Sequence, residues 1–203
     1  EQVVSFQDGT KGNARSVTGK NTKMLVQFAT TEAETVKVKV GLSTTGTAGA
    51  MKNLDSEIKG WNFDAVRNAT DKLWNSYLSR ISVTTLEDGQ RVAFYTSLYH
   101  ALIMPNLITD VDGAYVGWDH AAHKSSVGPL YTNFSLWDTY RALHPFLALM
   151  YPKENSRMVK SMLEHYKQTG MLPTNEYGLC ETWCMIGNHA GNVIAEALLK
   201  GDK

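Results

Sequence analysis

Residues 134–145 read FSLWDTYRALHP, and the rest of the chain is best interpreted around this stretch. Its side chains combine a carboxylate, a guanidinium and an imidazole with an apolar stripe at spacings of three and four, formed by Leu136, Trp137, Tyr140, Leu143, His144 and Leu147. This spacing predicts an amphipathic helix that begins near Ser135 and turns one face toward the core.

The same stretch carries two polar residues whose role the local pattern leaves open. Asp138 and Arg141 stand three residues apart, so they would be neighbours on the helix surface. One interpretation is an ordinary ion pair, which contributes only tenths of a kcal/mol. The other is a polar group that recognises a hydroxylated ligand, with Trp137 as a stacking platform.

Composition and charge narrow the class of protein. The 203 residues are 43% hydrophobic, and twenty acidic side chains balance twenty basic ones. Nucleic acids and anionic membranes both attract a basic surface excess, so we expect no nucleic-acid partner. The apolar runs span only a few residues, so we expect no membrane span either.

The first quarter of the chain carries the only strand-like patterns. Residues 1–22 lack periodicity and are expected to be an irregular lead-in, whereas residues 24–29 and 35–42 are typical of strands. Residues 43–57 are rich in Gly, Thr and Ala and are interpreted as a link. Two short strands are not stable alone, so they indicate the end of a larger β-domain or a sheet packed on helices.

Helical periodicity dominates from Trp61 onward. Beside the central helix it predicts four more, over residues 61–80, 88–104, 156–169 and 181–200. Asp88 is expected to cap the second of them and Gly170 to end the third. A short extended piece is expected at residues 81–86. The predicted fold class is therefore mainly α with a small β portion.

Residues 105–133 form a long segment without periodicity, which indicates a functional loop because its aromatic residues argue against disorder. Asp110 and Asp112 resemble the start of a calcium loop, but the later ligands are missing, so a turn is expected. His120 and His123 make a metal site conceivable without fixing a third ligand.

The segment before the last predicted helix holds the best candidates for proton transfer. Glu176 and Glu181 lie there, and Glu181 is expected at the N-terminus of that helix. Cys180 and Cys184 are interpreted as two buried free thiols rather than a zinc site or a disulfide. His144 and His189 are expected on helical faces as core residues.

Several motifs in one order carry a family resemblance, which runs from about Lys23 to the C-terminus. They are FYTSLYHALIMPN (94–106), DVDGAY (110–115), YTNFSLWDTYRALHP (131–145), GMLP (170–173) and ETWCMIGNHA (181–190). Together they resemble glycoside hydrolase family 92, whose members are mostly calcium-dependent, inverting, exo-acting α-mannosidases. The resemblance implies an N-terminal β-sandwich followed by a catalytic (α/α)6 toroid.

The resemblance also implies roles for individual residues. Glu181 would be the general acid, with Trp137, Asp138 and Arg141 around a terminal mannose and Glu176 as a further substrate-binding residue. The implied substrate is a mannose-containing glycan, the implied cofactor is calcium, and the implied process is N-glycan degradation. The implied location is secreted, periplasmic or on the cell surface.

The chain departs from the family pattern in ways that qualify this expectation. Asn175 stands where a tryptophan is common, and Asn188 and Asn192 replace a usual tyrosine and proline. The catalytic base and most calcium ligands are expected beyond Lys203. Residues 1–50 are therefore expected to end a β-sandwich and provide a linker, and residues 51–203 to begin the helical domain, as a fragment inactive alone.

Two other functions stay open from the sequence. A non-catalytic carbohydrate-binding protein would keep Trp137, Asp138 and Arg141 but bind sugar without turnover. A helical-toroid enzyme of another class, such as a lyase or a phosphorylase, would share the fold and use different chemistry.

Overall fold

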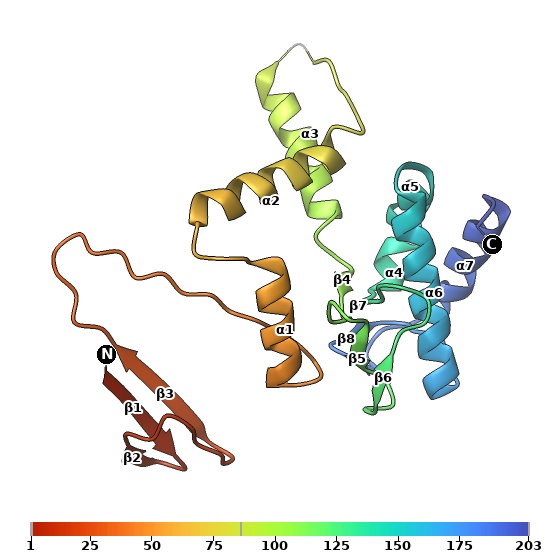
Figure 1. Ribbon diagram of the computed structural model, residues 1–203. Coiled ribbons are helices and arrows are strands. Elements are labelled where there is room, and N and C mark those ends of the chain that lie inside the picture. Colours follow the sequence, from red (N-terminus) through yellow and green to blue (C-terminus); the bar gives the residue numbers. More distant parts are fainter. Residues whose placement is uncertain (1, 86, 203) are drawn as a thin grey trace. The chain divides into compact units, whose positions relative to one another are not determined.

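The computed structural model describes residues 2–85 and 87–202. The chain divides between Val38 and Lys39 into two compact units, a small one of strands and a larger one that is mainly helical (Figure 1). The mainly α class with a small β portion is confirmed.

The first unit is an antiparallel sheet of three strands, in the order β2-β1-β3. Its strands are β1 (Gln2–Gln7), β2 (Thr10–Gly12) and β3 (Thr22–Gln27). The turn between β1 and β2 consists of Asp8 and Gly9, with φ angles of 49° and 89°. An Asp-Gly pair with two positive φ angles is the turn that matches the twist of a two-residue hairpin. The prediction of an irregular segment at residues 1–22 was therefore wrong for residues 2–12, whereas residues 13–21 have no regular strand or helix.

Of the two segments predicted as strands, one forms a strand and the other does not. Residues 24–27 do lie in β3, but residues 35–42 form no strand, and Val38 and Val40 are 74% and 71% exposed. Alternating valines suit a pleated surface, yet a strand also needs a partner to pair with. The prediction of a second strand was wrong.

Most of the predicted link at residues 43–57 is a helix, α1 (Thr47–Glu57), and only residues 43–46 lack regular structure. Asn53 is buried in it and donates from Nδ2 to Asp110 Oδ1 at 2.8 Å, while Ser43 and Thr45 donate to Asp110 Oδ2. Burial raises the pKa of Asp110, but the three hydrogen bonds outweigh it and leave this pKa below its ordinary value. Tertiary contacts thus stabilise a glycine-containing helix whose composition alone is unfavourable.

The next two helices, α2 (Phe63–Leu78) and α3 (Asp88–Ala101), confirm the predicted periodicity. Residues 81–85 between them form no regular strand, and Leu86 lies outside the described residues. The N-cap of α3 is Glu87, so the prediction of a cap at Asp88 was wrong, and Asp88 instead pairs with Arg91.

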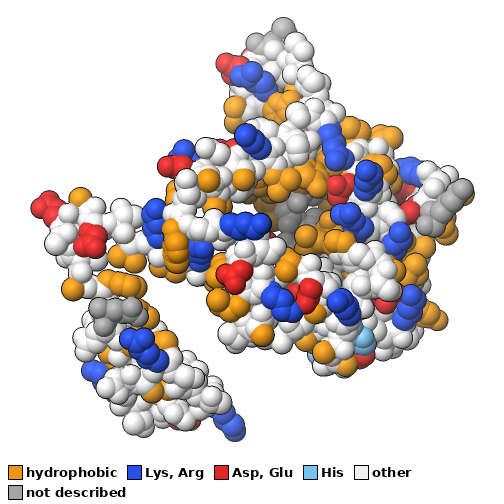
Figure 2. All heavy atoms as spheres, in the orientation of Figure 1, with side chains coloured by type: hydrophobic (Ala, Val, Ile, Leu, Met, Phe, Trp, Pro, Cys, Tyr) orange, Lys and Arg blue, Asp and Glu red, His pale blue; other side chains and the backbone are white. Residues whose placement is uncertain are grey.

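Apolar side chains of α2 and α3 remain at the surface, as the space-filling view shows (Figure 2). Phe63, Leu73 and Val92 are 69%, 59% and 63% exposed. The end of α2 is nevertheless attached to a later helix, because Tyr77 Oη donates to Glu154 and Tyr151 Oη donates to the Tyr77 carbonyl, each at 3.0 Å.

The segment 105–133, expected to be a loop, is built from two small strand pairs. β4 (Asn106–Leu107) pairs with β7 (Tyr131–Thr132), and β5 (Ala114–Val116) pairs with β6 (Ala122–Lys124). A separate core of Ile108, Tyr115, Trp118 and Leu130 fills it. The expected turn at Asp110 is confirmed by the Gly113 N–H, which donates to the Asp110 carbonyl.

The predicted central helix is interrupted. It consists of α4 (Leu136–Thr139) and α5 (Leu143–Met150), with a turn at residues 140–142. Pro145 explains the break, because in a continuous helix its ring would meet the carbonyl of Arg141 and no N–H could bond to it. In the first turn of α5 the missing N–H costs nothing.

The last helices complete the main core. They are α6 (Pro152–Thr169), which ends at Gly170 in the left-handed conformation as expected, and α7 (His189–Leu199). The core side chains come from the α4 region and α5 to α7: Phe134, Leu136, Leu147, Tyr151, Met158, Val159, Met162, Ala190, Val193 and Ala197.

A hairpin occupies the chain between α6 and α7, where the last helix was expected to begin. Its strands are β8 (Glu176–Tyr177) and β9 (Cys180–Glu181). Glu181 therefore lies in a strand and not at a helix N-terminus, and that prediction was wrong. Cys180 and Cys184 are free as expected, but they are exposed rather than buried. Among the described residues, no helix is long and apolar enough to cross a membrane.

Candidate active site

Backbone pairing brings the start of α4 against the β8–β9 hairpin. The Leu136 N–H donates to the Thr174 carbonyl at 3.2 Å, and the Glu176 N–H donates to the Phe134 carbonyl at 3.0 Å. Between these two bonds, Ser135 and Asn175 form an antiparallel bridge. The residues predicted in FSLWDTYRALHP and in the Glu181 segment are thus neighbours in space.

Glu181 is half-buried, and backbone donors hold its carboxylate. Oε2 accepts the Thr174 N–H at 2.8 Å and the Asn175 N–H at 3.2 Å, while Oε1 accepts the Thr182 N–H at 3.1 Å. Donors on both sides of the hairpin, before β8 and after β9, thus fix the side chain in one orientation. Its position therefore follows the backbone of residues 174–182.

A series of hydrogen bonds through Asn175 and Ser135 connects Glu181 with Asp138. The Asn175 Nδ2 donates to Ser135 Oγ at 3.2 Å, and Ser135 Oγ donates to Asp138 Oδ2 at 2.5 Å. We call Ser135, Asp138, Asn175 and Glu181 the Glu181 cluster. Sequence reasoning marked Asn175 only as a departure from a family pattern and missed Ser135, which has no chemical signal beyond its place before the helix.

The other two predicted residues lie beside this cluster at the surface. Trp137 is 40% exposed, and the Arg141 guanidinium lies 5.1 Å from the centre of the Tyr140 ring. Within residues 2–85 and 87–202, Asp138 forms no ion pair with Arg141, because the turn after α4 separates them. The interpretation as a helix-stabilising ion pair was wrong.

The structure does not bring Glu176 to this surface. Its residue is 3% exposed, and its carboxylate is bound by Trp118, His165 and the Asn133 backbone. Trp118 and His165 were not singled out as partners from the sequence. The role of Glu176 as a substrate-binding residue stays a prediction, and its enclosed side chain does not reach the surface beside Glu181.

The described residues offer no metal site of their own. No three of their His, Cys, Asp or Glu side chains gather where they could hold an ion. His123 Nε2 instead lies 2.9 Å from Asp119 Oδ1, and the Asp110 carboxylate is taken up by Ser43, Thr45 and Asn53. The calcium expectation stays a prediction about ligands supplied from elsewhere.

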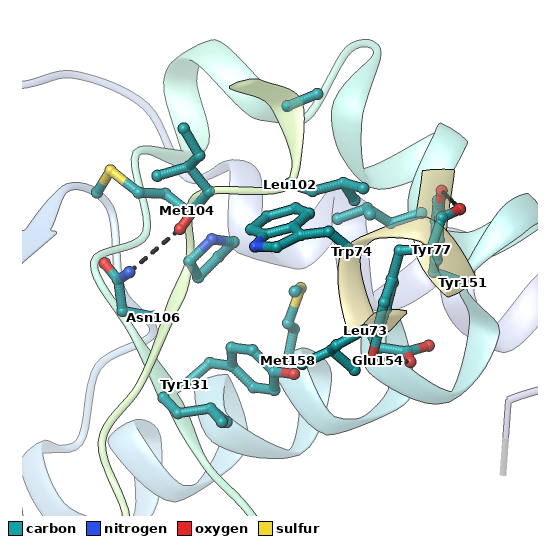
Figure 3. Close-up of a pocket in the computed structure, with 15 residues that line it drawn as sticks. Leu73, Trp74, Tyr77, Leu102, Met104, Asn106, Tyr131, Tyr151, Glu154 and Met158 are labelled. Carbon is teal, nitrogen blue, oxygen red and sulfur yellow. Dashed lines mark hydrogen bonds between the residues drawn. The ribbon is translucent and has the colours of Figure 1, made fainter. Parts of the chain in front are cut away.

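A separate cavity of about 290 Å³ lies between α2, the β4 region and α6 (Figure 3). Leu73, Trp74, Tyr131 and Met158 point into it, and Glu154 lies at one side. None of the predicted site residues lines this cavity. Its apolar lining does not suit the hydroxyl groups of a sugar, so it is not the candidate active site.

Comparison with known proteins identifies related domains. A family model described as the glycosyl hydrolase family 92 catalytic domain matches residues 49–203. A curated relative from Arthroderma benhamiae, described as an uncharacterized secreted glycosidase, is 27% identical over 169 residues, which cover 81% of this chain and 18% of that protein.

Solved structures agree over the whole chain. A family GH92 α-mannosidase from Bacteroides thetaiotaomicron is 34% identical with a TM-score of 0.86, and it has also been solved in complex with mannoimidazole. An inverting mannosidase of the same family and organism is 24% identical with a TM-score of 0.87. This chain is covered completely in both cases but spans only 28% of each solved chain.

Proposed function

Because the chain belongs to glycoside hydrolase family 92, we propose that it is part of an α-mannosidase that hydrolyses terminal α-mannosyl residues of glycans, including N-glycans. The fold supports this proposal, since the helical unit is similar to part of the (α/α)6 toroid of the solved family members. The chain spans 28% of the first of those enzymes, so the activity is proposed for an enzyme that contains this chain together with the other parts of the family fold.

The observation that carries the proposal is the Glu181 cluster. Hydrogen bonds connect the half-buried Glu181 carboxylate with Asp138 across two segments joined by a β-bridge, and the segment of Asp138 also carries the exposed Trp137 and Arg141. Cleavage of a glycosidic bond needs an acid beside a surface that binds sugar hydroxyls. The Glu181 cluster therefore supports the proposal.

We assign Glu181 as the general acid. In the proposed step its carboxylic acid transfers a proton to the glycosidic oxygen as the bond from that oxygen to the anomeric carbon breaks. To do so, one oxygen must turn from the backbone donors of Thr174 or Thr182 toward the leaving group. The remaining N–H bonds then keep the side chain oriented.

Trp137, Asp138 and Arg141 are assigned to the terminal mannose. An exposed indole provides a flat apolar face for a sugar ring, and the carboxylate and guanidinium accept from and donate to its hydroxyls. Ser135 holds Asp138 in place, so that only part of its hydrogen-bonding capacity remains for the sugar.

Inversion requires a second carboxylate that activates water on the opposite face of the sugar. We expect this base, together with the ligands of calcium, from parts of the enzyme other than the residues described here. Calcium would supply a positive charge that binds sugar hydroxyls, and no step above depends on it. The relative described as a secreted glycosidase supports a location outside the cytoplasm.

The direct test uses the full-length enzyme and follows an α-mannobioside by NMR. We expect mannose to be released from the non-reducing end, with the β-anomer appearing first. Release of the α-anomer first would contradict inversion. Binding without any release, unchanged by Glu181→Gln, would instead identify a non-catalytic carbohydrate-binding protein, and elimination or phosphorolysis products would identify another class of toroid enzyme.

A further inference from the structure

Glu176 is a second glutamate near the candidate acid, and its surroundings differ from those of Glu181. Its side chain is fully enclosed. Oε2 accepts the Trp118 Nε1–H at 2.8 Å and lies 3.0 Å from His165 Nδ1, and Oε1 accepts the Asn133 N–H at 2.9 Å. A buried carboxylate is tolerated only when its oxygens are bonded in this way.

The three groups that bond to Glu176 come from three separate parts of the fold. Trp118 follows β5, Asn133 follows β7, and His165 lies inside α6. The rings of Trp118 and His165 also stack, with centroids 5.0 Å apart and an angle of 7° between their planes. The Glu176 carboxylate therefore connects these three parts of the fold to strand β8.

The hairpin transmits this attachment to Glu181. Glu176 and Glu181 are directly paired across β8 and β9. Asn175, the residue before Glu176, donates its N–H to the Glu181 carboxylate and its amide group to Ser135. Any shift of the Glu176 backbone therefore moves both the donor that orients the acid and the link to the sugar-binding residues.

We propose that Glu176 is a positioning residue that fixes the β8–β9 hairpin and thereby orients the general acid Glu181. The catalytic consequence of this inference rests on the proposed function, whereas the attachment of the β8–β9 hairpin by Glu176 does not. Glu176 touches no substrate in this role. It acts through Asn175 and through the pairing with Glu181.

The substitution that tests the role is Glu176→Gln, which keeps the size of the side chain. A glutamine has one oxygen, so its NH2 group would oppose either the Asn133 N–H or the donors at Oε2. Leaving such a buried donor without an acceptor is costly, and a small displacement of the hairpin relieves it. A displacement of about 1 Å at a reacting group can lower the rate about 100-fold.

The experiment compares two substrates of the full-length enzyme, an α-mannobioside and 2,4-dinitrophenyl α-mannoside. The first needs protonation of its leaving group, whereas the second does not. For Glu176→Gln we expect kcat on the mannobioside to fall about 10- to 100-fold, with KM changed less than about 3-fold and the activated substrate spared. Glu164→Gln in α6, where the Glu164 side chain is 19% exposed and pairs with Lys167, is the control.

A second measurement separates positioning from activity. The Thr174 and Asn175 amides, which donate to Glu181, should exchange hydrogen at least about 10-fold faster in Glu176→Gln, because they lose that bond when the hairpin moves. If wild type releases no mannose, the proposed function fails, while faster exchange would still support the positioning role.

An equal loss of kcat on both substrates would overturn the inference, because a smaller fraction of folded enzyme lowers both rates by the same factor. Unchanged rates and unchanged amide exchange would overturn it as well. Should Glu176→Gln fail to fold, Trp118→Phe removes one donor and keeps the ring stacked on His165. It should give a smaller loss of the same selective kind, and a non-selective loss would again contradict the proposal.

Discussion

Two glutamates five positions apart in the sequence have opposite environments. Both are candidates from residue type alone, and nothing local shows that Glu176 is enclosed while Glu181 stays half-exposed. The difference arises from Trp118, which lies 58 residues before Glu176, and from His165 on a neighbouring helix. The family motif predicts Glu181 as the acid, whereas the proposed role of Glu176 depends on contacts that arise only in the folded chain.

The buried His144 makes a prediction about pH. Burial lowers its pKa from the ordinary 6.5 to about 4, although a bond with Asn155 acts in the opposite direction. Between these two pKa values the unfolded chain binds a proton that the folded chain does not. Stability contributed by neutral His144 is therefore fully present above pH 6.5 and is lost as the pH falls toward 4, by on the order of 2 to 3 kcal/mol.

The measurement is the free energy of unfolding of the full-length enzyme between pH 7 and pH 4.5. In His144→Phe this acid-dependent loss should shrink by most of that amount, because the phenyl ring has no proton to bind. His100→Gln, at an exposed position of α3, should leave the pH dependence as in wild type. An unaltered pH dependence in His144→Phe would show that another group is responsible.

At the scale of elements, long periodic helices were predictable and short or glycine-rich ones were not. The periods of α2, α3 and α6 come from their own sequences. α1 is stabilised by the hydrogen bond of Asn53 with the distant Asp110, and α7 starts eight residues later than its apolar pattern suggested because the β8–β9 hairpin takes up residues 176–181. The Pro145 signal was present in the sequence, but the apolar stripe across it masked the break.

Two glycines provide a matched prediction about helix ends and interiors. Gly170 ends α6 with a φ angle of 79°, whereas Gly191 lies inside α7 with ordinary helical geometry, and an added Cβ would have open space at both positions. Gly170→Ala should therefore destabilise the enzyme by about 1 kcal/mol, and Gly191→Ala should stabilise it by about 0.5 to 1 kcal/mol.

Chemical denaturation of both variants under one condition measures this difference. An added Cβ has open space at both sites, so the two substitutions differ only in backbone conformation. Effects of the same sign would therefore contradict the explanation by backbone conformation.

At the scale of the whole molecule, the chain consists of a small unit of strands and a mainly helical unit that contains the match to the family 92 catalytic domain. Its division lies between Val38 and Lys39, and the family model begins at residue 49. Several motifs in one order made the family predictable. The catalytic base and the calcium ligands could not be predicted, because the chain spans 28% of the solved relatives and we expect these groups from other parts of the enzyme.

The connection between the two units predicts where a protease cuts first. Residues 28–46 have no regular strand or helix and are mostly exposed, so they can enter a protease active site without unfolding either unit. Limited digestion with trypsin should cleave first after Lys37 or Lys39, and replacing both lysines with Gln should delay cleavage of this segment. Mass spectrometry of early products checks this, and a first cut after Lys160, inside α6, would contradict it.

The claim that Glu181 is the general acid is tested most directly by kcat/KM of Glu181→Gln in the full-length enzyme across α-mannosides with leaving groups of increasing acidity. For sugar leaving groups we expect a loss of about 100- to 10,000-fold, and for the 2,4-dinitrophenyl group a loss of less than about 10-fold, since that group departs without a proton. Glu164→Gln should match wild type throughout. An equal loss for every leaving group would contradict the assignment of Glu181 as the acid.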